Sequence, residues 1–110
     1  ERFLQMCAEN NMQIVNATTP AQQFHVLRRQ LKRSFRKPLI CFTPKKLLRY
    51  PTCVSKLKDF TEGAFQEVID DKIDLKNVTR LAFCSGKIYY DLIERREQEG
   101  VNDIAFIRLE

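Results

Sequence analysis

Three cations that follow a short apolar run are the residues best suited to bind a ligand. Residues 39–42 (LICF) form the run, and Lys45, Lys46 and Arg49 come after a Thr-Pro break. A short apolar run without alternation predicts a strand that is buried on both faces. Pro44 ends that strand because proline has no N–H to donate. In open α/β sheets, ligands bind beyond the carboxyl ends of the strands, so this loop is the first candidate site.

The spacing of the cations favours an anion as the ligand. Lys45 and Arg49 are four residues apart, and a helical turn at Lys46 to Arg49 would project them to one side. Arginine could then hold a phosphate through two parallel hydrogen bonds. Arg36 or Arg80 would add a fourth cation if either folds nearby. The alternative is a solvated cationic loop, and charge alone does not choose between the two.

A second short motif, Ser85-Gly86-Lys87, separates a predicted strand from a predicted helix. Backbone N–H groups at a helix start can hold an anion, and Lys87 would add charge there. The motif lacks the glycines of a P-loop or of a dinucleotide fingerprint. We therefore favour a tight turn in which Gly86 supplies the backbone angles.

The remaining polar residues point less clearly to chemistry. The basic stretch 28–37 could meet an acidic partner or nucleic acid, but an exposed helix face explains it more simply. No aromatic interleaving for base stacking accompanies it. His25 is the only histidine, and we expect it at the surface or its boundary rather than in catalysis. No nucleophile elbow or metalloprotease motif is present, so a self-contained enzyme is not expected.

The elements that must position these residues follow from apolar periodicity. A strand at 12–16, a helix from Pro20 and a strand at 38–42 form one βαβ unit with parallel strands. Thr19 is the expected helix cap, and Phe24, Leu27 and Leu31 are expected to face inward. A strand is predicted at 65–69 and a solvent-facing connection at 70–77. A strand at 78–84, a helix at 88–97 and a strand at 103–109 form the second βαβ unit, with Ile88 and Leu92 facing inward.

Composition sets the wider limits. The chain has 110 residues, 44% of them hydrophobic, and a formal net charge of +5, which favours anionic partners without choosing among them. No apolar run is long enough to span a bilayer. The four cysteines lack metal-site spacing, and Cys41 and Cys84 lie in apolar runs, which fits a reducing compartment. No metal site is expected. Neither end of the sequence resembles a natural terminus, so we expect a piece of a longer chain.

Several longer motifs together resemble the thiamine-diphosphate-dependent first component of the 2-oxoglutarate dehydrogenase complex. They are FHVLRRQ at 24–30, RKPLICFTPKKLLRYP at 36–51 and CSGKIYYDL at 84–92, with TTPAQQFH and DIAFIRLE in support. They cover nearly the whole chain in order. The chain departs from the family pattern at Lys46, where most members have serine, and at Tyr50, where most have histidine.

The resemblance implies a Rossmann-like, transketolase-like α/β fold of mostly parallel strands. Residues 1–50 would end the pyrimidine-binding domain, and residues 51–110 would begin the C-terminal α/β domain. The full enzyme decarboxylates 2-oxoglutarate on thiamine diphosphate with Mg²⁺ and succinylates lipoyl groups. The Gly-Asp-Gly cofactor motif and the catalytic histidines are absent from this stretch. It is therefore expected to hold no catalytic residue, cofactor or metal.

The resemblance also implies partners. The full enzyme would be a homodimer that works with a lipoyl-bearing succinyltransferase, in the bacterial cytoplasm or the mitochondrial matrix. Acetyl-CoA or AMP would be an effector, held by Lys45, Leu47, Leu48 and Arg49 by position, with Lys46 substituted. Arg80 and Lys87 are further candidates from charge alone. No nucleic-acid or membrane partner is expected. The alternative function is a stand-alone α/β module that binds a phosphorylated ligand, and the length of the parent reading frame would distinguish the two.

Overall fold

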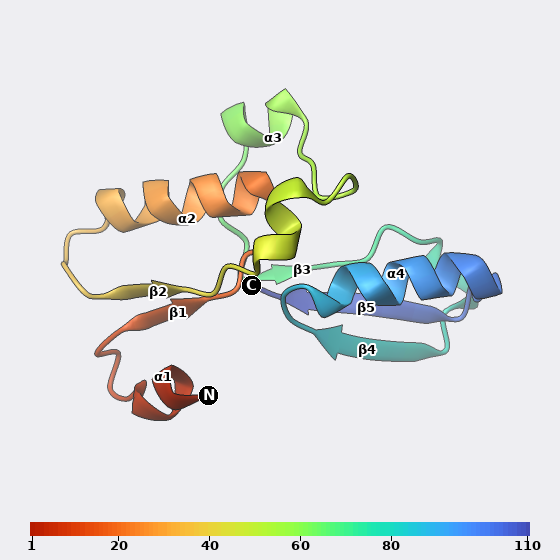
Figure 1. Ribbon diagram of the computed structural model, residues 1–110, viewed down its shortest axis with the longest axis horizontal. Helices are drawn as coiled ribbons and strands as arrows, with labels where there is room; N and C mark the ends of the chain where they lie inside the picture. The colour runs from red at the N-terminus through yellow and green to blue at the C-terminus, as the bar shows by residue number, and fades with distance from the viewer. The chain divides into compact units, whose positions relative to one another are not determined.

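The chain forms two compact units of mixed α/β structure, which we describe separately. The computed structural model describes residues 1–110, and their contacts divide the chain into Glu1–Phe65 and Gln66–Glu110. Figure 1 shows helices and short strands in each unit. No helix has the length and apolar character needed to cross a membrane. The predicted α/β class with Rossmann-like βαβ units is confirmed.

The first unit contains the first predicted βαβ motif. Its elements are α1 (Arg2–Met6), β1 (Gln13–Val15), α2 (Pro20–Lys32), β2 (Leu39–Cys41), the 3-10 turn η1 (Lys45–Arg49) and α3 (Leu57–Thr61). Strands β1 and β2 pair in parallel, with Ile14 opposite Ile40. Thr19 caps α2 as predicted, because its hydroxyl accepts from the Gln22 N–H at 3.2 Å, and Pro20 occupies the first turn.

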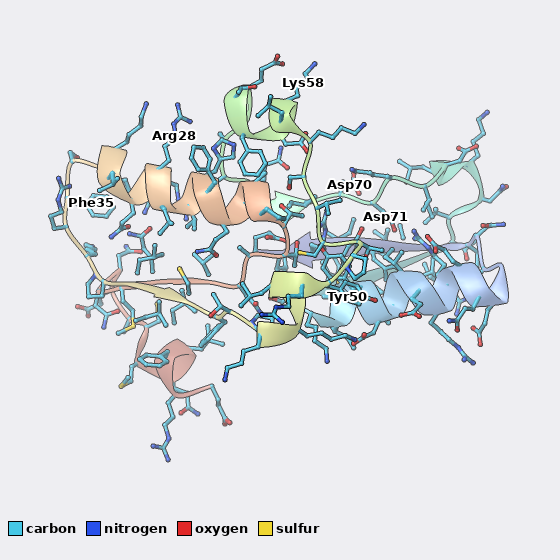
Figure 2. The ribbon with its side chains drawn as sticks, turned by 45° about the horizontal axis from the view of Figure 1, so that its top comes forward. Arg28, Phe35, Tyr50, Lys58, Asp70 and Asp71 are labelled. Carbon is cyan, nitrogen blue, oxygen red and sulfur yellow. The ribbon has the colours of Figure 1, made fainter.

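The inward face of α2 differs from the prediction. Phe24, Leu27 and Leu31 were expected inside, but they are 45%, 51% and 78% exposed. The buried residues lie on the opposite side of the helix and are Ala21, Gln22, His25 and Val26. Figure 2 shows Arg28 on the outer side of this helix. Helical periodicity correctly grouped the apolar residues on one face, but it does not say which face the unit's other elements cover. Strand β2 also differs, because it is half-buried rather than buried on both faces.

His25 lies in the interior, which corrects the expectation that it sits at the surface. It is 3% exposed, and its Nε2 donates to the backbone carbonyl of Asp59 at 2.8 Å. Its neighbour Phe24 meets Phe60 of α3 edge to face, with ring centroids 5.7 Å apart. These two contacts hold α3 against α2. Neither contact was predicted from the sequence, because α3 follows an irregular polar stretch.

The second unit contains the second βαβ motif and an added edge strand. Its elements are β3 (Val68–Ile69), the 3-10 turn η2 (Leu75–Asn77), β4 (Arg80–Cys84), α4 (Ile88–Glu99) and β5 (Ile104–Leu109). The strand order is β3-β5-β4. Strands β4 and β5 are parallel as predicted, whereas β3 is antiparallel to β5. The strand predicted at 65–69 is shorter because only its last two residues pair with β5.

Helix α4 covers one face of this sheet. Arg108 lies over the Tyr89 ring at 4.1 Å, and Arg96 lies over the Phe106 ring at 5.0 Å, so Phe106 and Arg108 face the helix. Gly100 ends the helix at φ +63°, as glycine does readily. Of the predicted inward residues, Ile88 is 48% exposed, while Tyr90 is the buried residue of the helix.

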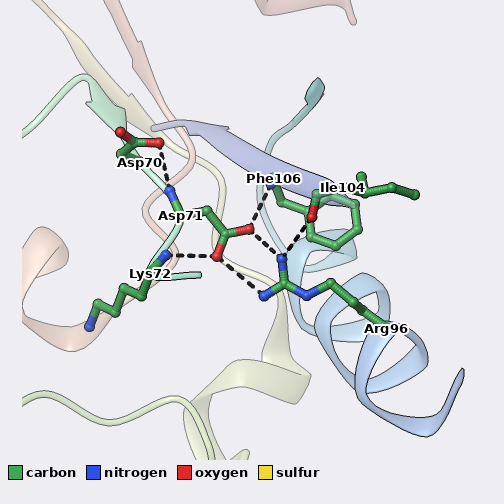
Figure 3. Close-up of polar contacts among 6 residues, drawn as sticks. All are labelled: Asp70, Asp71, Lys72, Arg96, Ile104 and Phe106. Atoms are coloured by element: carbon green, nitrogen blue, oxygen red, sulfur yellow. Dashed lines mark hydrogen bonds and ion pairs between the residues drawn. The ribbon is translucent and has the colours of Figure 1, made fainter. Parts of the chain in front are cut away.

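A buried ion pair joins three separate segments of the second unit (Figure 3). The Asp71 carboxylate pairs with the Arg96 guanidinium of α4 and accepts from the Phe106 N–H of β5 at 2.7 Å. Arg96 also donates to the carbonyl of Ile104 at 3.1 Å. The Asp71 side chain is 2% exposed and that of Arg96 is 12% exposed. The segment 70–77 was expected to face solvent, and that expectation is wrong at Asp71.

These contacts decide the charge state of Asp71. Burial raises the pKa of its carboxyl, but hydrogen bonds from Arg96 and from the Phe106 N–H outweigh burial. The pKa of Asp71 therefore falls below its ordinary value of 3.8. A buried charge that loses its partner is costly, so the pair fixes the connection after β3 onto α4 and β5.

Replacing the carboxylate should loosen β5. In the intact protein, Asp71→Asn leaves Arg96 buried without a counter-charge, and we expect local opening to become easier by about 3 to 5 kcal/mol. Hydrogen–deuterium exchange of the 104–109 segment should accelerate accordingly. Asp70→Asn is the matched control, because Asp70 is the exposed neighbour and accepts only from the Asp71 N–H. Equal exchange in both variants would contradict this role.

Low pH should likewise loosen β5 in the wild-type protein. A carboxyl with a lowered folded-state pKa stabilises the fold above its unfolded value, and the stabilisation is lost as pH falls through the folded value. Protection of the Phe106 amide, corrected for intrinsic exchange, should therefore fall below about pH 4. The Asp71→Asn variant should lack this step, and a step of the same size in the variant would show that another carboxyl causes it.

Candidate effector site

The predicted cationic loop forms a tight 3-10 turn bounded by two prolines. The last hydrogen bond between β1 and β2 runs from the Phe42 N–H to the Val15 carbonyl, at 2.8 Å. Pro44 then precedes η1, whose first bond runs from the Leu47 N–H to the Pro44 carbonyl at 3.1 Å. Pro51 follows Tyr50 and prevents the turn from continuing. The predicted helical turn is therefore present, but its type changes the alignment of the side chains.

A 3-10 turn aligns residues three apart rather than four. Lys46 and Arg49 therefore share one side of η1, and Lys45 aligns with Leu48. The expectation that Lys45 and Arg49 project together depended on α-helical spacing, which η1 does not have. Lys45 and Arg49 are exposed and contact no carboxylate. Lys46 lies 5.0 Å from the centroid of the Tyr50 ring, which Figure 2 shows after the turn.

The leucines of the same turn line an open apolar pocket of about 450 Å³. Leu48 is 81% exposed and lines the pocket together with other apolar side chains, and a grouped apolar surface of this kind can mark a ligand-binding groove. The other walls come from the start and outer face of α2 and from the loop after η1. The lining residues are Ala17, Thr18, Thr19, Pro20, Gln23, Phe24, Leu27, Thr43, Pro44, Leu47, Leu48 and Cys53. A pocket of this size with cations beside it suits a ligand that has an apolar part and an anionic part.

The α2 wall of this pocket was not found from the sequence. Phe24 and Leu27 were assigned to the core, so their exposed stripe was not considered as a binding surface. Cys53 was also unassigned, and its thiol donates to the Thr18 carbonyl at 3.4 Å. The α2 stripe lies well upstream of the predicted loop in the sequence, and only the fold brings the two together.

Each of the other predicted cations makes contacts within its own unit. Arg36 precedes β2, so it lies at the strand end opposite η1, and it donates to the carbonyls of Arg33 and Phe35. Arg80 begins β4, whereas Lys87 follows the other end of that strand. Arg80 pairs with Asp103 at 2.9 Å, and its hydrogen bonds lower the pKa of Asp103. Lys87 lies 3.9 Å from Asp91.

The Ser85-Gly86-Lys87 turn has the structural role that we favoured. Gly86 is buried and has φ +67°, a backbone conformation that other residues adopt with strain. Lys87 occupies the cap position of α4 and makes no side-chain cap bond. No group of three or more His, Cys, Asp or Glu side chains could hold a metal ion.

Comparison with known proteins now assigns the chain to a family. Residues 54–110 match the family described as 2-oxoglutarate dehydrogenase C-terminal. The chain belongs to that family. Residues 1–51 match the transketolase pyrimidine-binding domain. The two matches meet between residues 51 and 54, whereas the contacts divide the chain after Phe65. Helix α3 therefore lies within the 2-oxoglutarate dehydrogenase C-terminal match although it packs on α2. The proposed boundary after Tyr50 stays a prediction.

Individual relatives agree with this assignment. The chain is 52% identical to the 2-oxoglutarate dehydrogenase E1 component of Azotobacter vinelandii over 112 aligned positions. It is 54% identical to that of Cupriavidus necator and 52% identical to that of Haemophilus influenzae. Each match covers 100% of this chain and 12% of the relative. The resemblance stated from the motifs is confirmed, and the chain spans about one eighth of the length of these curated relatives.

Proposed function

We propose that this chain is part of an enzyme that oxidatively decarboxylates 2-oxoglutarate and succinylates lipoyl groups. The observation that carries this proposal is the identity of about one half along the whole chain with E1 components from several bacteria. Thiamine diphosphate, with Mg²⁺, would supply the electron sink for decarboxylation. The partners would be a second copy of the enzyme and a lipoyl-bearing succinyltransferase. The compartment would be the bacterial cytoplasm, or the mitochondrial matrix in a eukaryote.

Within that enzyme we assign this stretch a structural and regulatory role. Its only histidine, His25, is buried and its Nε2 is engaged by the Asp59 carbonyl, so it is poorly placed to move a proton to a substrate. No group of three or more His, Cys, Asp or Glu side chains in this stretch could hold a metal ion. We place the cofactor elsewhere in the enzyme and route no catalytic step through this stretch.

The regulatory role rests on η1 and its pocket. We propose that acetyl-CoA or AMP places its phosphates against Lys46 and Arg49 and its apolar part against Leu47 and Leu48. The alignment of Lys46 and Arg49 on one side of the 3-10 turn supports this pairing, with Lys45 contributing longer-range charge. The same geometry would serve a stand-alone module that binds a phosphorylated ligand. Decarboxylation of 2-oxoglutarate by the intact protein therefore distinguishes the enzyme from the stand-alone module.

The enzyme assignment is tested on the intact protein that contains this chain. With thiamine diphosphate, Mg²⁺ and ferricyanide as electron acceptor, we expect 2-oxoglutarate-dependent ferricyanide reduction together with release of carbon dioxide. The reaction without thiamine diphosphate is the control. Absence of turnover in a folded protein that binds a nucleotide at η1 would favour the stand-alone module.

The effector site is tested separately in the active enzyme. Lys46→Ala with Arg49→Ala should raise the effector concentration that gives half-maximal response by about tenfold, because two charge-assisted hydrogen bonds are lost. Lys45→Ala with Arg49→Ala should also weaken the response. Affinity for thiamine diphosphate should be the same in both. Arg28→Ala with Lys32→Ala removes equal charge from α2 and is the control. An unchanged response in an active enzyme would reject this site without touching the enzyme assignment.

A further inference from the structure

The positive charge of the chain is concentrated in its first unit. Residues 1–65 contain 12 Lys and Arg against 4 Asp and Glu, a formal +8, whereas residues 66–110 contain 7 against 10, a formal −3. The 49 residues from Asn10 to Lys58 include 11 of the cations and no acidic residue. Such a one-signed field is unfavourable for the unit alone and attracts anionic partners. The proposed effector would neutralise only the small part of this charge at η1.

A second open groove lies at the other end of β2 from η1. It has a volume of about 440 Å³ and is lined by Asn10, Met12, Gln13, Arg33, Phe35 and Lys37. The Arg33 guanidinium lies 5.3 Å from the centroid of the Phe35 ring, and the Lys37 ammonium lies 5.4 Å from it. Phe35 is 41% exposed, and Figure 2 shows it in the connection between α2 and β2. We call these six residues the Phe35 groove.

A chain of amide side chains holds the Arg33 guanidinium in place. Arg33 donates to the Gln13 side-chain carbonyl, Gln13 donates to Gln30 at 2.9 Å, and Gln30 donates to the Lys37 carbonyl at 2.6 Å. These bonds link β1, α2 and the start of β2. Because one N–H of Arg33 is already fixed, its remaining donors are oriented before a ligand arrives. Orientation of this kind reduces the entropy lost on binding.

Ion pairing does not account for the charges of the groove cations. Arg29 and Lys32 lie in the last turn of α2, where cations offset the helix dipole. Arg33 is the C-cap residue of α2 and Lys37 lies four residues further on, and neither forms an ion pair. Glu9, which immediately precedes the groove residue Asn10, forms no ion pair either. The two cations therefore line an open groove without counter-charges.

We propose that the Phe35 groove docks a carboxylate-rich polypeptide segment of a partner subunit. A guanidinium fork matches a carboxylate with two parallel hydrogen bonds, and Met12 and Phe35 offer apolar contact to the stems of acidic side chains. The exposed Arg28 and Lys32, one helical turn apart on α2, extend the positive surface beyond the groove. This inference goes beyond the proposed function and does not depend on the effector site.

The ring contacts favour a peptide over nucleic acid. Single-stranded nucleic acid needs aromatic faces on which its bases stack, but cations lie over the Phe35 ring, and no other aromatic residue lines the groove. A concave groove is also poorly shaped for a membrane, which is usually met by the apolar face of an amphipathic helix. Carboxylates on a flexible chain can enter the groove and reach both cations.

The test uses the intact protein and a fluorescein-labelled peptide of glutamates with interspersed leucines. We expect saturable binding by anisotropy that weakens as salt rises, because the contacts are ionic. Arg33→Gln with Lys37→Gln should weaken binding by about tenfold or more. Gln13→Leu keeps the net charge but removes the acceptor that orients Arg33, so it should weaken binding by a smaller factor. Hydrogen exchange of β1 and α2 in each variant checks that the unit remains folded.

Lys45→Gln with Arg49→Gln is the matched control, because it removes the same charge from the same unit outside the groove. If it weakens peptide binding as much as the groove variant does, binding follows net charge and the proposal is wrong. Equal binding of a peptide with glutamine in place of glutamate would also overturn it. So would stronger competition by single-stranded RNA than by unlabelled peptide, or self-association of the protein that Arg33→Gln with Lys37→Gln abolishes.

Discussion

The second unit depends on one buried ion pair, Asp71 with Arg96. Only about 45 residues form this unit, so its apolar core is small. The pair adds a specific connection between segments, because it ties the stretch after β3 to α4 and β5 through a carboxylate that also accepts the Phe106 N–H. Arg96 then reaches the Ile104 carbonyl of the same strand. Two residues thus order three segments, at the cost of burying two charges that must remain paired.

The first unit depends on backbone constraints instead. Pro20 begins α2, and Pro44 and Pro51 bound the η1 turn, so the chain enters and leaves the candidate site at fixed points. The short space between the two prolines favours a 3-10 turn over an α-helical one. That choice places Lys46 beside Arg49 and presents Leu47 and Leu48 to the α2 stripe. The chemistry available at η1 is thus set by local backbone geometry.

The sequence predicted the secondary-structure elements well, but it predicted poorly which face of each element is buried. Both βαβ units, the Thr19 cap and the Gly100 stop were predicted, because each depends on local signals within a few residues. The burial of Phe24, Leu27 and His25 was predicted wrongly, because burial depends on which distant segment packs there. Asp71 was missed for the same reason, since its partner Arg96 lies 25 residues away. At the candidate site, the cationic turn was found from charge, but its pocket required the fold.

Both units carry exposed apolar area on one of their faces. In the second unit, Leu81 and Phe83 point away from α4 and are 61% and 67% exposed. Parallel strands such as β4 and β5 are almost always covered on both faces, and exposed apolar area of this kind marks a contact surface. The relatives are about eight times longer than the matched stretch, so in the proposed enzyme ample chain is available to cover this face. The exposed apolar face of β4 is therefore a candidate contact surface within the proposed enzyme.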